Sequence, residues 1–189
     1  MELHGLPRRQ SALLVCSGGF RSSLVRPIVE ALYRIRPDFR LLAPALSTGD
    51  AMFKKWCILL PPGTKRSAGA GNYRPLRQAV SWLNGGGLLV VFPAGDLSER
   101  SNETVLSMEP RWSDAIARLA ILTGSLAIPT LAVGNADGEA SIHPGKPICS
   151  VTLMSMPSLR AATEHIRVCA ERIDPAPLSR VRLVPRWSA

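Results

Sequence analysis

The chain has 189 residues, of which 46% are hydrophobic, and a formal net charge of +9. This length and apolar content fit a globular domain with a buried core and exclude a chain too polar to fold. No apolar run approaches the ~20 residues that a membrane-spanning helix needs, so no transmembrane helix is predicted.

The first half of the chain alternates apolar runs with amphipathic stretches. Residues 11–16 are apolar after the first position and predict a buried strand. Residues 22–35 carry hydrophobic side chains at helical spacing, with serine at the start. Residues 39–46 and 57–62 predict two more strands, and residues 73–84 a helix that three glycines terminate.

The second half repeats this alternation. Residues 88–93, LLVVFP, form the clearest buried strand, since a parallel strand is often apolar throughout. Residues 111–124 predict a helix and residues 125–134 a strand. We expect one or two further strands over 140–154 and an amphipathic helix over 158–173, followed by a tail rich in proline and arginine.

These elements predict a single α/β domain with a mostly parallel mixed sheet flanked by helices. We divide the chain into the α/β domain, residues 1–155, and a C-terminal helix with a basic tail, residues 156–189, packed on that domain or extending from it. Ligands of such sheets gather beyond the carboxyl ends of the strands. Residues 16–23 and 92–100 both follow strands, so we expect one cleft between them.

Cysteines and histidines are scattered and form no metal-binding pattern. The cysteines are Cys16, Cys57, Cys149 and Cys169, and the histidines are His4, His143 and His165. Neither a zinc site nor a disulfide framework matches these spacings, so we expect reduced thiols and no tightly bound cofactor. We interpret His143, next to a proline in a strand, as a surface or hydrogen-bonded histidine.

The block VVFPAGDLSER, residues 90–100, resembles the Phe-Pro-Glu-Gly block of the phospholipid/glycerol acyltransferases. It is most similar to the haemolysin-type branch that includes ornithine lipid N-acyltransferases, where Phe-Pro-Ala-Gly is common. Residues 111–135 resemble that branch's Trp-bearing helix and Ile/Val-Pro strand, and residues 141–150 resemble its late Gly-Lys-Pro-Ile strand. The resemblance covers roughly residues 10–150 and implies an acyltransferase-like fold.

The chain departs from that family at the catalytic motif. The family has a His, which takes the acceptor's proton, followed four or five residues later by an Asp that orients it. Ser17 and Ser23 stand at these two positions here, and no histidine lies between His4 and His143. A serine hydroxyl cannot accept that proton unaided, and losing a general base costs about 10²–10⁴-fold in rate. The catalytic motif is therefore predicted to be degenerate.

The resemblance also implies a substrate-binding rim. We expect that rim to include Phe92, Pro93, Gly95, Ser98 and Arg100. Arg21 and Arg26 flank a predicted helix start, where backbone N–H groups and guanidinium groups suit a phosphate or carboxylate. The alternatives are a tight turn with a capping serine after the strand, and arginines that are simply solvated.

The resemblance implies an acyl thioester, on acyl carrier protein or coenzyme A, as donor and an amine or hydroxyl as acceptor. A net charge of +9 favours anionic partners, either an acidic carrier or an anionic membrane surface. Nucleic acid is disfavoured because no nucleic-acid-binding motif is present. The alternative function is a non-catalytic acyl-, lipid- or carrier-protein-binding partner of a biosynthetic complex. No signal peptide is recognisable, so we expect a cytoplasmic protein that can contact the inner membrane face.

Overall fold

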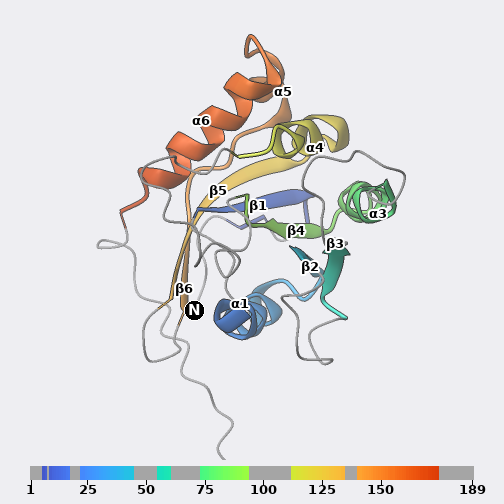
Figure 1. Cartoon of the computed structure of the whole chain (residues 1–189), viewed down its shortest axis with the longest axis vertical. Helices are drawn as coiled ribbons and strands as arrows, with labels where there is room; N and C mark the ends of the chain where they lie inside the picture. The colour runs from blue at the N-terminus through green and yellow to red at the C-terminus, as the bar shows by residue number, and fades with distance from the viewer. Residues whose placement is uncertain are drawn as a thin grey trace, which may run out of the picture.

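A central sheet with helices on both faces organises the chain in the computed structural model (Figure 1). The structure describes residues 6–7, 9–17, 22–44, 55–60, 73–93, 112–134 and 140–174. The strands are β1 (Ala12–Ser17), β2 (Phe39–Pro44), β3 (Cys57–Leu60), β4 (Leu88–Val91), β5 (Leu126–Gly134) and β6 (Ala140–Pro144). The helices are α1 (Ser22–Ile35), α3 (Tyr73–Asn84), α4 (Ala115–Thr123), α5 (Ser150–Met154) and α6 (Leu159–Glu171).

The strands follow the order β3-β2-β4-β1-β5-β6 across the sheet. Every neighbouring pair is parallel except β5 and β6, which are antiparallel. The predicted fold class, a single α/β domain with a mostly parallel mixed sheet, is therefore confirmed.

Strand β1 lies near the middle of the sheet and is buried on both faces. Leu14 and Cys16 pack into the core cluster shared with α1, whereas Leu13 and Val15 pack into the cluster shared with α3, α4 and α6. All four side chains are at most 1% exposed. This double burial explains why β1 reads as a continuous apolar run rather than as an alternating one.

Residues 150–154 correct the sequence-based assignment, because they form helix α5 and not a strand. Strand β6 ends at Pro144. Gly145 and Pro147 follow it, and both residue types are unfavourable in the interior of a sheet, so the chain leaves the sheet here. Ile148 then makes an isolated antiparallel bridge with Ala127 before the helix begins. A short apolar run does not distinguish a strand from a buried helical turn, which is the origin of the error.

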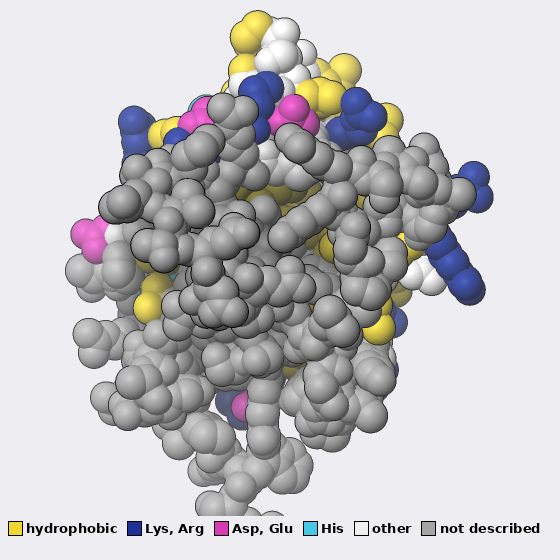
Figure 2. Space-filling view, in the orientation of Figure 1, with side chains coloured by type: hydrophobic (Ala, Val, Ile, Leu, Met, Phe, Trp, Pro, Cys, Tyr) yellow, Lys and Arg dark blue, Asp and Glu magenta, His cyan; other side chains and the backbone are white. Residues whose placement is uncertain are grey.

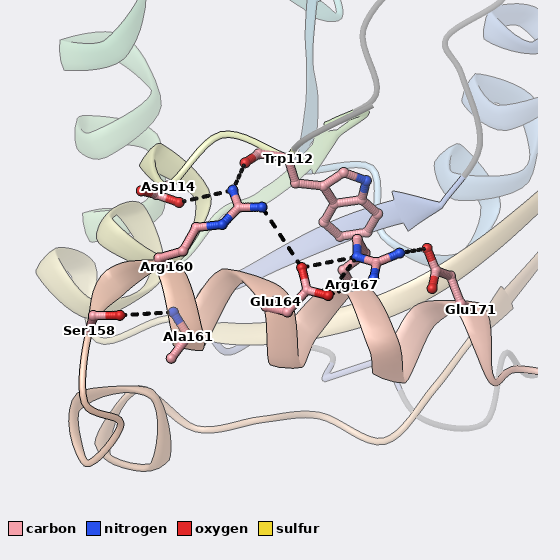
Figure 3. Close-up of polar contacts among 8 residues, drawn as sticks. All are labelled: Trp112, Asp114, Ser158, Arg160, Ala161, Glu164, Arg167 and Glu171. Carbon is pink, nitrogen blue, oxygen red and sulfur yellow. Dashed lines mark hydrogen bonds and ion pairs between the residues drawn. The ribbon is translucent and has the colours of Figure 1, made fainter. Parts of the chain in front are cut away.

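Helix α6 packs across the sheet and is tied to the start of α4. Its buried residues Ala162, Ile166 and Ala170 recur at helical spacing and join the core cluster on that face. Arg160 reaches from α6 to the carbonyl oxygen of Trp112 at 2.9 Å and to the carboxylate of Asp114 at 3.5 Å (Figure 3). The basic tail, residues 175–189, lies outside the described residues.

Arg36 connects four parts of the chain at the opposite end of the sheet from Ser17. Its guanidinium is 2% exposed. It donates hydrogen bonds to the carbonyl oxygens of Pro7 and Gln10, each at 2.7 Å, and to that of Gly86. Its Nε also donates to Asp38 Oδ1 at 3.0 Å. The N-terminal segment, α1, β2 and the turn before β4 are thereby held together.

Candidate functional site

The sheet brings together the ends of the two strands that carry the predicted motifs. Strands β1 and β4 are parallel neighbours, with Val15 opposite Val91. Ser17 ends β1, and Phe92 and Pro93 follow β4, so these residues lie at the same edge of the sheet. Neighbouring strands are separated by about 4.8 Å. The chain therefore has a candidate site at the carboxyl edge, formed around the ends of β1 and β4.

The Ser17 hydroxyl is engaged by the neighbouring strand. Ser17 is 6% exposed, and its Oγ donates a hydrogen bond to the carbonyl oxygen of Thr130 at 3.2 Å. A serine nucleophile needs its hydroxyl proton directed at a base. In this arrangement the proton is directed at a backbone carbonyl of β5, so Ser17 braces the sheet.

His143 occupies the same row of the sheet as Ser17. In the strand register, Ser17 lies opposite Leu131 of β5, and Leu131 lies opposite His143 of β6. Two strand spacings, about 10 Å, therefore separate the Cα atoms of the serine and the histidine, and side chains in such a row project from the same face. His143 is 4% exposed. Its imidazole is thus inside the protein, on the face of the sheet toward which Ser17 is directed.

Sequence alone does not connect His143 with the candidate site. Of the two interpretations, a surface or a hydrogen-bonded histidine, the structure excludes the surface one, because the residue is 4% exposed. The signal that links it to Ser17 is strand register, which joins residues more than 120 positions apart in the chain. The register between β5 and β6 cannot be determined from one sequence, because it is set by the position at which the two strands pair in the folded protein.

The other predicted site residues are placed only in part. Phe92 is 9% exposed and belongs to the core cluster beneath α1, so it anchors the end of β4. Pro93 is half-buried next to it. Ser23 and Arg26 lie in α1, which begins shortly after β1, but their side chains are not among those described. Four predicted substrate-binding residues lie outside the described residues: Arg21, Gly95, Ser98 and Arg100.

Cys16, next to Ser17, does not supply a nucleophile. Complete burial raises the pKa of the Cys16 thiol to about 12, because the surrounding core disfavours the thiolate. Among the residues that the structure describes, no three His, Cys, Asp or Glu side chains are grouped so as to hold a metal ion. No helix within those residues is long and apolar enough to cross a bilayer.

Neither a family model nor a curated protein matches this chain. The motif resemblance and the placement of residues at the carboxyl edge of the sheet are therefore the features that bear on function.

Proposed function

We propose that the chain handles an acyl thioester, carried by acyl carrier protein or coenzyme A, and presents it to a hydroxyl or amine acceptor. The observation that carries this proposal is the adjacency of β1 and β4. The resemblance requires the loop after the first strand and the Phe-Pro block to face one cleft. Strands β1 and β4 are parallel neighbours, so the strand ends from which both segments continue lie at one edge of the sheet, where α/β proteins bind ligands.

Acyl transfer at this edge needs a basic group that can accept the proton lost by the acceptor. The acceptor oxygen or nitrogen bonds to the acyl carbon, the carbon–sulfur bond breaks, and the proton lost by the acceptor finally protonates the departing thiolate. Ser17 cannot hold that proton on the way, because a hydroxyl is too weak a base. Among the described histidines, His143 is the one that the strand register places in the same row as Ser17. We therefore assign His143 as the candidate proton acceptor for an active enzyme.

The hydrogen bond of Ser17 favours a second candidate function, that of a non-catalytic acyl- or carrier-protein-binding protein. A buried hydroxyl that donates to a backbone carbonyl stabilises the sheet and leaves no activated group at the former histidine position. Such a protein would retain the thioester cleft and would support a partner enzyme in a biosynthetic complex. The two candidate functions share the cleft and differ in turnover.

An apolar tip supports the proposal that the protein works at an anionic membrane surface. Leu122 of α4 is 68% exposed, and Val151 and Met154 of α5 are 71% and 64% exposed. Helices α4 and α5 contact each other, and Figure 2 shows hydrophobic side chains at the tip of the molecule with both basic and acidic side chains below it. Residues 140–158 contain no acidic side chain. An exposed apolar surface of this kind suits insertion into the interface of a bilayer, and the net charge of +9 favours an anionic one.

Radiolabelled acyl groups on acyl carrier protein and on coenzyme A, offered with a panel of amines and lipid alcohols in anionic vesicles, test the proposal. Acyl transfer that His143→Asn reduces by about 10²-fold or more supports the enzyme. Stoichiometric acyl binding in native mass spectrometry without transfer supports the binding protein. If neither donor gives transfer above the buffer rate and neither gives acyl binding, both candidate functions are refuted.

A further inference from the structure

A second site lies at the opposite edge of the sheet from Ser17. It is a groove of about 440 Å³ between α3 and the amino-terminal ends of β2 and β3. Nine residues line it: Asp38, Arg40, Cys57, Ile58, Gln78, Ser81, Trp82, Gly85 and Gly87. Its volume lies in the range of small-molecule sites, which is about 300–1,000 Å³. The groove and the candidate thioester site are at opposite strand ends, so neither depends on the other.

Arg40 is held rigidly in this groove by Trp82. The guanidinium carbon lies 4.3 Å from the centroid of the Trp82 ring, and Nη1 donates to the carbonyl oxygen of Phe39 at 3.0 Å. The indole is fixed in turn, because its Nε1 donates to the carbonyl oxygen of Leu88 at 3.1 Å. Gly87 leaves room for the ring, since a Cβ there would overlap the indole nitrogen of Trp82. The guanidinium is therefore positioned before any ligand arrives.

No carboxylate among the described residues forms an ion pair with Arg40. Asp38 lines the same groove, but Arg36 neutralises it: Arg36 Nε lies 3.0 Å from Oδ1, and Nη2 lies 3.1 Å from Oδ2. A guanidinium has five N–H donors, and Arg40 uses one of them in the bond to Phe39. The remaining donors are available to a ligand.

The surroundings of the groove are positive and aromatic. Lys55 lies 5.2 Å from the centroid of the Trp56 ring, which is itself 5.9 Å from the Arg40 guanidinium. Arg77 is exposed on α3 and lines an adjoining groove of about 400 Å³ that shares Ser81 with the first. Neither Lys55 nor Arg77 forms an ion pair with a described carboxylate. Arg40 is the cation that lines the groove, and the positive charges of Lys55 and Arg77 outside the lining add to its attraction for an anionic ligand.

We propose that this groove binds a small organic phosphate, with the phosphate on Arg40. A planar guanidinium matches the oxygens of a phosphate in a bidentate arrangement, and the positive surroundings outside the lining favour a dianion over a singly charged carboxylate. The Gln78 amide and the Ser81 hydroxyl line the groove as further donors. Ile58 and the edge of Trp82 provide an apolar wall for the organic part of the ligand.

Nuclear magnetic resonance of the indole N–H groups tests this site with phenyl phosphate as the probe and inorganic phosphate as the comparison. The chain has four tryptophans, so the Trp82 signal is assigned from its absence in Trp82→Phe. We expect a saturable shift of that signal with phenyl phosphate. We expect Arg40→Gln to weaken binding by about tenfold or more. Arg40→Lys should weaken it less, because lysine keeps the positive charge but cannot make the bidentate contact of a guanidinium.

Arg118→Gln is the matched control, because Arg118 is an exposed arginine on α4 that does not line the groove. Its affinity for phenyl phosphate should equal that of the unmodified chain. Equal weakening by Arg118→Gln and Arg40→Gln would overturn the proposal in favour of a diffuse positive field. Absence of a saturable Trp82 shift would overturn the site. Inorganic phosphate that binds as tightly as phenyl phosphate would overturn the role of the apolar wall.

Discussion

Replacing Arg36 with methionine should destabilise the protein more than any surface charge change. The substitution keeps an unbranched side chain of similar length and removes every hydrogen bond of the guanidinium. Three backbone carbonyls, those of Pro7, Gln10 and Gly86, then lose their donor. The Asp38 carboxylate loses its cation as well.

The expected loss follows from the burial of this group. Arg36 is 2% exposed, so its guanidinium donors can be replaced by water only where the partly buried acceptors reach solvent. An acceptor left unpaired in a buried site costs about 1–3 kcal/mol and three carbonyls lose their donor, whereas the Asp38 carboxylate is 45% exposed and its charge stays solvated. Burial of the methionine side chain returns about 1–2 kcal/mol of this. We expect Arg36→Met to lower the free energy of unfolding by about 4 kcal/mol.

Urea unfolding followed by tryptophan fluorescence measures this difference, with Asp38→Asn as the control. The Asp38 side chain is 45% exposed, so solvent compensates for the lost charge and a loss of at most about 1 kcal/mol is expected. A loss below about 1 kcal/mol for Arg36→Met would refute the reasoning. Equal losses in the two variants would also refute it, because the carbonyl contacts would then contribute nothing.

Three further experiments, two substitutions and one thiol-labelling measurement, have defined outcomes. Gly87→Ala should lower the free energy of unfolding by about 1–3 kcal/mol in urea, because its Cβ would overlap the Trp82 indole; an unchanged midpoint would show that the ring can move. Cys149 should be the first thiol alkylated by iodoacetamide in mass spectrometry, since its side chain is exposed and hydrogen bonds from Thr152 lower its pKa. Cys16, with a pKa raised to about 12 by burial, should react only on unfolding, and early labelling there would contradict the described core. Thr163→Val should be neutral or stabilising by about 1 kcal/mol in thermal unfolding, because the buried Thr163 hydroxyl has no partner among the described residues; a clear loss would indicate a hidden partner.

Local patterns were enough to predict most of the fold. The apolar run of β1 and the Leu-Leu-Val-Val run of β4 identify doubly buried strands, because such strands need no polar face. The three glycines after Asn84 mark the end of α3, and Gly86 does take the left-handed conformation, with φ of 85°. Helix α5 was missed, because its five residues are too few for helical periodicity to be visible.

The candidate site could be predicted from the sequence less completely than the fold. The loop after β1 and the Phe-Pro block could be placed at one edge, because parallel strands share their direction. The burial of His143 and its position in the row of Ser17 depend on the antiparallel pairing of β5 with β6, which no local pattern encodes. The Arg40 groove was missed for a similar reason, because Arg40 and Trp82 are distant in sequence and meet only when α3 packs beside β2.

Crosslinking with a photoreactive acyl-coenzyme A that carries a diazirine on its acyl chain tests the proposed thioester site most directly. We expect labelling, mapped by mass spectrometry, within residues 18–26 or 94–111, the segments that follow β1 and β4, and we expect excess palmitoyl-coenzyme A to suppress it. Labelling confined to other parts of the chain, or labelling that the competitor leaves unchanged, would contradict a thioester cleft at the carboxyl edge of the sheet.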